Sequence, residues 1–273
     1  MYHYRRLVPD DISARALILS LLSTVDVDRQ AIGALVNAGD LFGIEPVTIR
    51  VAATRLVKSG LLESPERGIY APGPKAKALT RRLQQWRDVS DRLSDWTGSW
   101  LVCLTHHLGR ADRKKLRERE RALMLYGYRE TPNGLWVRPA NISRTIDELR
   151  DELVSIGAGD GIMLMEASDF ATGLAKHWES LWSAKELHAS YTAAIADMTS
   201  SLPRLATLPP DEAARESLLI GQAVIRTINF DPLLPPELAD QGLFLQMVET
   251  MKRYNETGIA CWDKYHASMN LGA

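Results

Sequence analysis

Residues 45–70 constrain the fold of this chain more than any other stretch; they read EPVTIRVAATRLVKSGLLESPERGIY. Pro46 suits the first position of a helix, and the Glu45 carboxylate meets the positive end of the helix dipole. Apolar residues then recur at three- and four-residue spacing, which predicts one buried stripe: Ile49, Ala52, Ala53, Leu56 and Val57. Gly60 is expected to end this amphipathic helix.

The opposite face of the predicted helix carries cations and hydroxyl groups. Arg50, Thr54 and Lys58 follow one another at intervals of four residues, with Thr48 and Arg55 alongside. A short helix with an apolar back and such a front is typical of helices that enter the major groove of DNA. The simpler interpretation is an amphipathic surface helix. We take these five residues as candidate DNA contacts.

A hairpin is expected after the helix. Two short apolar runs, 61–62 and 69–70, flank the link 63–68, in which proline and glycine indicate a turn. Arg67 then lies near the tip, where it is a candidate contact to phosphate or to the minor groove. Helix followed by hairpin is the second half of a winged helix.

Two earlier helices complete this pattern. Ser13 can cap a helix over residues 14–23, and Asp26 or Asp28 starts a second helix. Three helices and a hairpin predict a winged-helix DNA-binding domain at residues 1–73. The polar residues before Asp11 are expected to be a disordered tail, with contact to DNA or to a partner subunit as the alternative.

The remaining chain divides into three further parts. Residues 74–98 are expected to form a connecting helix. Residues 99–168 show the order strand–helix–strand–strand–helix–strand, with a cap at Ser143, which predicts a ferredoxin-like central domain. Residues 169–273 are expected to be all helical, with separate helices at 235–254 and 257–269. The predicted fold class is therefore α+β.

Charge is unevenly distributed, although the formal net charge is only −1. Residues 45–82 contain eight Lys or Arg and three Glu, whereas residues 168–273 contain eight Lys or Arg and thirteen Asp or Glu. The basic part coincides with the predicted helix and hairpin. A DNA-reading module joined to another domain would have this asymmetry.

The cysteines and the hydropathy indicate the compartment. Cys103 and Cys261 are far apart in apolar surroundings, so we interpret them as reduced thiols of a cytoplasmic protein. No apolar run approaches the length of a membrane span, and no secretory signal is recognised. We expect no cofactor, because phosphate-binding glycine loops and zinc-ligand spacings are missing from the sequence.

Three blocks of sequence, in order along the chain, carry a resemblance to a known family. The first block is TIRVAATRLVKSGLL with the following GIY. The second comprises Trp100, the tripeptides KLR (115–117) and YGY (126–128), and GLWVRP (134–139). The third is Arg226 with FDPLLPPEL (230–238). Together they resemble the phenylacetic-acid-degradation repressor family, the PaaX-like transcriptional regulators. The chain departs from that pattern after the third block, where ADQGL (239–243) stands in place of a proline and tryptophan segment.

The resemblance implies a winged helix, a central domain similar to a small CRISPR adaptation nuclease, and a helical C-terminal domain. It also implies a homodimeric repressor of catabolic genes, bound to double-stranded operator DNA and released by an aryl-CoA or other acyl-CoA effector. Aromatic rings and cations suit such a ligand, so Trp178, Trp182 and Arg226 are the candidate effector-binding residues. Each tryptophan can equally be core, and Arg226 can instead pair with Asp231.

An enzyme is the alternative from a different class. His106 and His107 follow a predicted strand, where metal ligands are often found. Adjacent side chains on a strand point to opposite faces, however, and no carboxylate at fixed spacing completes a metal site. A metal-dependent nuclease in the central domain is therefore the weaker prediction, and we expect no catalytic residues.

Overall fold

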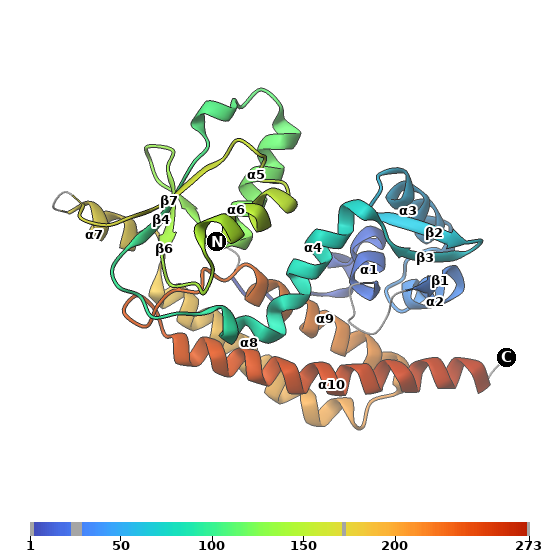
Figure 1. Ribbon diagram of the computed structural model, residues 1–273. Helices are drawn as coiled ribbons and strands as arrows, with labels where there is room; N and C mark the ends of the chain where they lie inside the picture. The colour runs from blue at the N-terminus through green and yellow to red at the C-terminus, as the bar shows by residue number, and fades with distance from the viewer. Residues whose placement is uncertain (1–2, 23–28, 171–172, 272–273) are drawn as a thin grey trace. The chain divides into compact units, whose positions relative to one another are not determined.

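The protein is a mixed α+β chain, seen in a computed structural model that describes residues 3–22, 29–170 and 173–271 (Figure 1). It forms two compact units. The helix–hairpin unit comprises Tyr4–Arg87, Ala193–Arg226 and Met247–Ala273, and the sheet unit comprises Met1–His3, Asp88–Thr192 and Thr227–Gln246. The four-part division predicted from the sequence follows chain order, whereas each unit combines segments from both halves of the chain.

The first part of the helix–hairpin unit alternates short helices with a three-stranded antiparallel sheet of order β1-β3-β2. The elements are η1 (Pro9–Asp11), α1 (Ala14–Leu21), β1 (Gln30–Ala31), α2 (Ile32–Asp40), α3 (Pro46–Lys58), β2 (Leu62–Glu66), β3 (Ile69–Pro72) and α4 (Pro74–Gln84). As predicted, Ser13 Oγ caps α1 by accepting from the Ala16 N–H at 3.1 Å. Leu17, Ile49 and Leu56 are fully buried between these helices.

Two local predictions for this part need correction. The second helix begins at Ile32 and not near Asp28, because β1 precedes it; Asp26 and Asp28 lie outside the described residues. The hairpin link is shorter than expected, since β2 extends to Glu66 through an irregularity in strand register. Pro65 fits there because β2 is an edge strand, where a missing N–H is tolerated.

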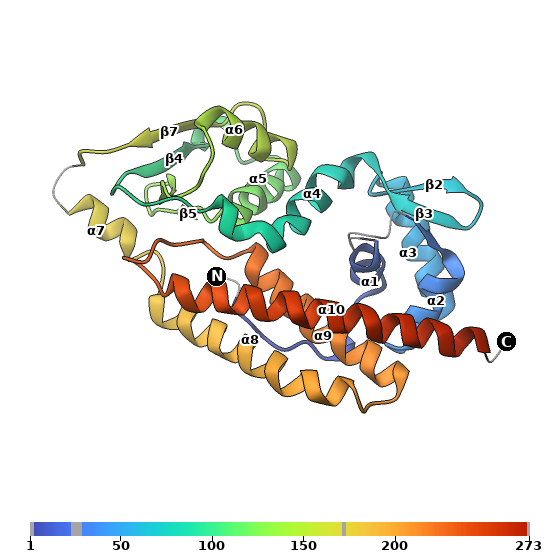
Figure 2. The same cartoon turned by 60° about the horizontal axis from the view of Figure 1, so that its bottom comes forward.

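Three long helices complete the helix–hairpin unit, and their parts within it run side by side in Figure 2. They are α8 (Ala184–Leu205), α9 (Pro210–Asn229) and α10 (Gln241–Leu271). The two predicted C-terminal helices are a single helix of 31 residues that starts only at Gln241, since nothing between 254 and 257 breaks it. Leu219 and Trp262 pack against the core of α1, α2 and α3. Among the described residues no helix is long and apolar enough to cross a membrane.

The N-terminal segment is bound to these helices, so the expectation of a disordered tail is wrong for the described residues 4–8. Tyr4 donates a hydrogen bond to Asp197 Oδ2 at 2.6 Å. Arg6 lies 3.9 Å from Asp197 Oδ1 and 3.7 Å from Glu216 Oε2. These contacts place the segment on α8 and α9 within the helix–hairpin unit.

The sheet unit contains a four-stranded antiparallel sheet of order β5-β6-β4-β7. Its elements are β4 (Trp100–Leu104), η3 (His106–Leu108), α5 (Arg113–Leu125), β5 (Arg129–Glu130), β6 (Trp136–Pro139), α6 (Ile146–Ser155), β7 (Met163–Ala167) and α7 (Leu174–Glu179). The predicted order of strands and helices is therefore present. Helices α5 and α6 lie together on one side of the sheet in Figure 1.

Helix ends in and before this unit differ from the sequence expectations. The predicted connecting helix stops at Gln84 and continues as a 3-10 stretch, η2 (Gln85–Arg92), with non-helical backbone at Asp88. Thr145, not Ser143, caps α6, because Glu148 three residues later completes a capping box. The helical part predicted after residue 169 begins with two separate helices, α7 and α8.

Candidate functional site

Helix α3 exposes its predicted contact residues to solvent. Its apolar stripe, Ile49, Ala53 and Leu56, is buried, and this burial fixes which face points outward. The six candidate residues are all exposed: Thr48, Arg50, Thr54, Arg55, Lys58 and Arg67. Sequence reasoning missed two neighbours on the same face, Val47 and Val51, whose exposed fractions are 65% and 43%. Their periodicity opposite the buried stripe was the available signal.

The end of α3 is fixed as the sequence predicts. The Leu61 N–H donates to the Leu56 carbonyl at 3.0 Å, and the Gly60 N–H donates to the Val57 carbonyl at 2.9 Å. This pair of bonds is a Schellman motif, which requires the left-handed backbone that Gly60 adopts at φ +74°. The helix therefore ends at Lys58, with Ser59 as its capping residue, and β2 begins at Leu62.

Arg67 lies in the tight turn between β2 and β3, and acidic residues of the hairpin have basic partners. Glu66 lies 3.4 Å from Arg29 Nη1, and Glu63 lies 3.6 Å from Lys77 Nζ. Such exposed ion pairs contribute little to stability. They do offset the negative charge nearest the turn, so the cations of α3 and Arg67 dominate this surface.

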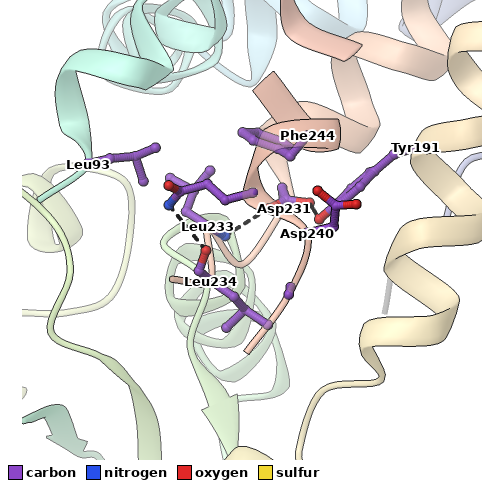
Figure 3. Close-up of a pocket in the computed structure, with 9 residues that line it drawn as sticks. Leu93, Tyr191, Asp231, Leu233, Leu234, Asp240 and Phe244 are labelled. Carbon is purple, nitrogen blue, oxygen red and sulfur yellow. Dashed lines mark hydrogen bonds between the residues drawn. The ribbon is translucent and has the colours of Figure 1, made fainter. Parts of the chain in front are cut away.

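A buried polar network surrounds the third sequence block in the sheet unit. Asp231 is 5% exposed, and its carboxylate accepts from the Tyr191 hydroxyl at 2.6 Å and from the Leu233 N–H at 2.8 Å (Figure 3). Burial raises the pKa of Asp231 to about 7, although both hydrogen bonds favour the ionised form. Leu233 has a left-handed backbone with φ +52°, which a residue with a side chain adopts only when neighbouring contacts hold it.

Arg138 and Asn141 join the second sequence block to the third. Arg138 is fully buried and donates to the Tyr126 and Pro139 carbonyls and, at 2.9 Å, to Asn141 Oδ1. The Asn141 amide then donates to the Leu233 carbonyl at 2.7 Å. Burial lowers the pKa of Arg138 to about 10. The role of Asn141 was missed, because it follows the GLWVRP motif and carries no pattern of its own.

Backbone packing brings the same two blocks together at Gly127. A Cβ atom at this position would lie 2.6 Å from the Pro232 carbonyl oxygen, and φ is +78°. Only glycine fits so close a backbone approach without a shift. The second and third blocks are therefore one structural feature, with backbone contact, a buried arginine and a buried aspartate.

The candidate effector residues fall in different surroundings. Trp178 and Trp182 are 3% and 6% exposed and pack against Trp100, with ring centroids 5.5 and 6.0 Å apart. This cluster has the features of an aromatic core, so a ligand would reach either ring only after the cluster opens. Arg226 is exposed on α9 in the helix–hairpin unit. Its pairing with Asp231 and the effector site both stay predictions.

The two histidines considered as metal ligands lie in η3, just after β4. His107 Nε2 lies 2.7 Å from the Gly161 carbonyl oxygen, while His106 lines a small hollow with Arg110, Glu120 and Glu130. Across residues 3–22, 29–170 and 173–271, no three His, Cys, Asp or Glu side chains form a group suited to a metal ion. The nuclease alternative stays a prediction.

Two hollows in the sheet unit are candidate ligand sites. The hollow beside Asp231, Tyr191 and Phe244 has no room for an enclosed water molecule, and the hollow at His106 holds about 40 Å³. Small-molecule sites usually measure about 300–1,000 Å³. Neither hollow therefore accommodates an acyl-CoA as it stands.

Comparisons with known proteins support the fold alone. No family model matches the chain, and no curated protein matches it. Among solved structures, the chain is similar to the uncharacterized protein Rv0674 from Mycobacterium tuberculosis, with a TM-score of 0.55 and 21% sequence identity. The match covers 91% of this chain and 98% of that one. The similarity therefore extends over both units.

Proposed function

We propose that this protein is a sequence-specific DNA-binding transcriptional regulator. The observation that carries the proposal is the exposed face of α3, where Arg50, Thr54 and Lys58 stand opposite a buried apolar stripe. Three helices followed by a hairpin with Arg67 in its turn support a winged-helix interpretation. In this arrangement α3 reads base edges, and Arg67 contacts phosphate or the minor groove.

We further propose that the protein is a PaaX-like regulator that represses a catabolic operon. Two observations support this finer assignment. The strand order β5-β6-β4-β7 is that expected of a ferredoxin-like central domain, and the second and third sequence blocks join through Arg138, Asn141 and Leu233. The protein acts as a homodimer on two half-sites, because one recognition helix covers too few base pairs for useful specificity.

The DNA-binding proposal is tested by selecting bound duplexes from a random library and measuring affinity by gel shift. Arg50→Ala should weaken binding and relax preference at one base pair, since a bidentate arginine–guanine contact contributes about 1–3 kcal/mol of discrimination. Arg67→Ala should weaken all sequences alike and reduce the salt slope by about 1. Arg253→Ala, which removes an exposed cation from α10, is the matched control and should change neither.

The same experiment separates the regulator from the nuclease. With Mg²⁺ or Mn²⁺ present, the regulator leaves labelled duplex intact while shifting it in the gel. Metal-dependent cleavage that His106→Ala or His107→Ala abolishes would instead establish the nuclease, whose candidate histidines both lie in η3.

We also propose that an acyl-CoA effector releases the protein from its operator. The test is a separate titration of the protein–operator complex with phenylacetyl-CoA, free phenylacetate and unrelated acyl-CoAs. Release of DNA by a CoA ester from the wild type, but not from Arg226→Ala, supports an acyl-CoA site at that arginine. Because Trp178 and Trp182 are buried, their participation predicts a fluorescence change when the ester binds. Release by none of the ligands removes the effector proposal and leaves DNA binding in place.

A further inference from the structure

Helix α3 presents an aliphatic pair at the centre of its cationic face. Val47, Val51, Thr54 and Lys58 follow the spacing i, i+4, i+7, i+11, which forms one straight ridge along an α-helix. Val47 is 65% exposed and Val51 43%. The other aliphatic residues of the helix are less exposed: Ala52 and Val57 are half-buried, and Ile49, Ala53 and Leu56 are buried.

The fold does not account for this pair. β-branched residues are weaker helix formers than alanine, and an exposed valine forgoes the stabilisation that burial provides. A single exposed apolar residue is ordinary, but these two lie one turn apart. Arg50 and Arg55, both exposed, flank them on either side. The surface therefore combines an apolar ridge with positive borders.

The positive charge around the ridge indicates which class of partner can bind there. A second copy of the same face would bring like charges together, which is unfavourable. A polyanion with an apolar group at the right depth satisfies both parts of the surface. In the major groove of DNA, the C5-methyl group of thymine is that apolar group, and phosphates border the groove on both sides.

We propose that Val47 and Val51 read thymine methyl groups, so that the half-site contains A·T base pairs beneath the N-terminal part of α3. The position fits, because Val47 follows Pro46 at the start of the helix and recognition helices contact bases with their N-terminal residues. The proposal rests on the DNA-binding function above and adds the chemical identity of the bases that α3 recognises.

The test replaces each thymine of a selected duplex by deoxyuridine, which removes only the methyl group. At one or two positions per half-site, the wild type should lose affinity about fourfold for each methyl group. In Val47→Ala or Val51→Ala the loss at the corresponding position should disappear, which is a double-mutant cycle between one side chain and one methyl group. Val51→Ile should retain the effect.

Ile259→Ala is the matched control, because this exposed aliphatic residue lies on α10. It should keep the full sensitivity to deoxyuridine. Failure to enrich any duplex would overturn both the DNA-binding function and this inference. If a duplex is enriched and Arg50→Ala relaxes its selection, but no deoxyuridine effect depends on either valine, the inference alone is overturned. A change in oligomeric state in the valine variants, with unchanged DNA binding, would also overturn it.

Discussion

The contact between Gly127 and the Pro232 carbonyl allows a sharp test of how the second and third sequence blocks join. Gly127→Ala adds a Cβ atom at a left-handed position, where it would lie 2.6 Å from the carbonyl oxygen. Gly134→Ala is an unusually close control. Gly134 has the same φ of +78°, yet no atom lies within 4 Å of its added Cβ.

The two variants separate backbone strain from close packing. Left-handed strain costs about 1–2 kcal/mol, partly offset because alanine lowers the entropy of the unfolded chain by about 0.4–1 kcal/mol. Gly127→Ala adds overpacking against backbone, which costs roughly 1–3 kcal/mol. At about 2–4 °C per kcal/mol, Gly127→Ala should melt roughly 2–12 °C below Gly134→Ala.

Thermal unfolding followed by near-ultraviolet circular dichroism measures this difference. The signal is suitable because Trp100, Trp178 and Trp182 pack together in the same unit. Equal melting temperatures for the two variants would refute the close approach. Full stability of Gly127→Ala would show that the loop at Pro232 does not lie against this turn.

Three further predictions follow from the buried groups and the sequence resemblance. The pKa of Asp231 is about 7 in the folded protein, so between about pH 4 and pH 7 the folded state retains a proton that the unfolded state has lost. The free energy of unfolding should therefore fall as pH rises from about 4 to 7. Asp231→Asn should flatten this pH dependence in urea titrations. Tyr4→Phe should cost about 1–2 kcal/mol of unfolding free energy by removing a bond to Asp197, while Arg5→Ala, which breaks the exposed pair with Asp11, should cost less than about 0.5 kcal/mol. Light scattering without DNA should give about twice 30.5 kDa, and a monomer at micromolar concentration would contradict the proposed dimer.

Local sequence signals predicted the elements that depend on local chemistry. Pro46 and Gly60 mark the ends of α3 because first-turn proline and left-handed glycine act within a few residues. The capping box of Thr145 and Glu148 is of the same kind, although the cap predicted from the sequence is Ser143. Ser143 and Thr145 are both hydroxyl residues that could cap the helix, and only Thr145 has an acidic residue three positions later.

Long-range packing could not be predicted from local sequence signals. The burial of Arg138 depends on acceptors from residues 126, 139 and 141, and the position of Leu233 depends on Asn141, 92 residues away. No signal in the sequence of residues 4–8 indicates that Tyr4 donates a hydrogen bond to Asp197. Such contacts join segments whose separation along the chain hides their proximity, and they are why the units do not follow chain order.

Lysine acetylation footprinting, read by mass spectrometry, tests the central claim most directly. Lys58 lies on the exposed face of α3, while Lys114 and Lys115 are exposed on α5. With a selected duplex bound, the account predicts that acetylation of Lys58 falls strongly and that Lys114 and Lys115 react as in the free protein. Protection of Lys114 and Lys115 with Lys58 unchanged would contradict α3 as the DNA-reading surface.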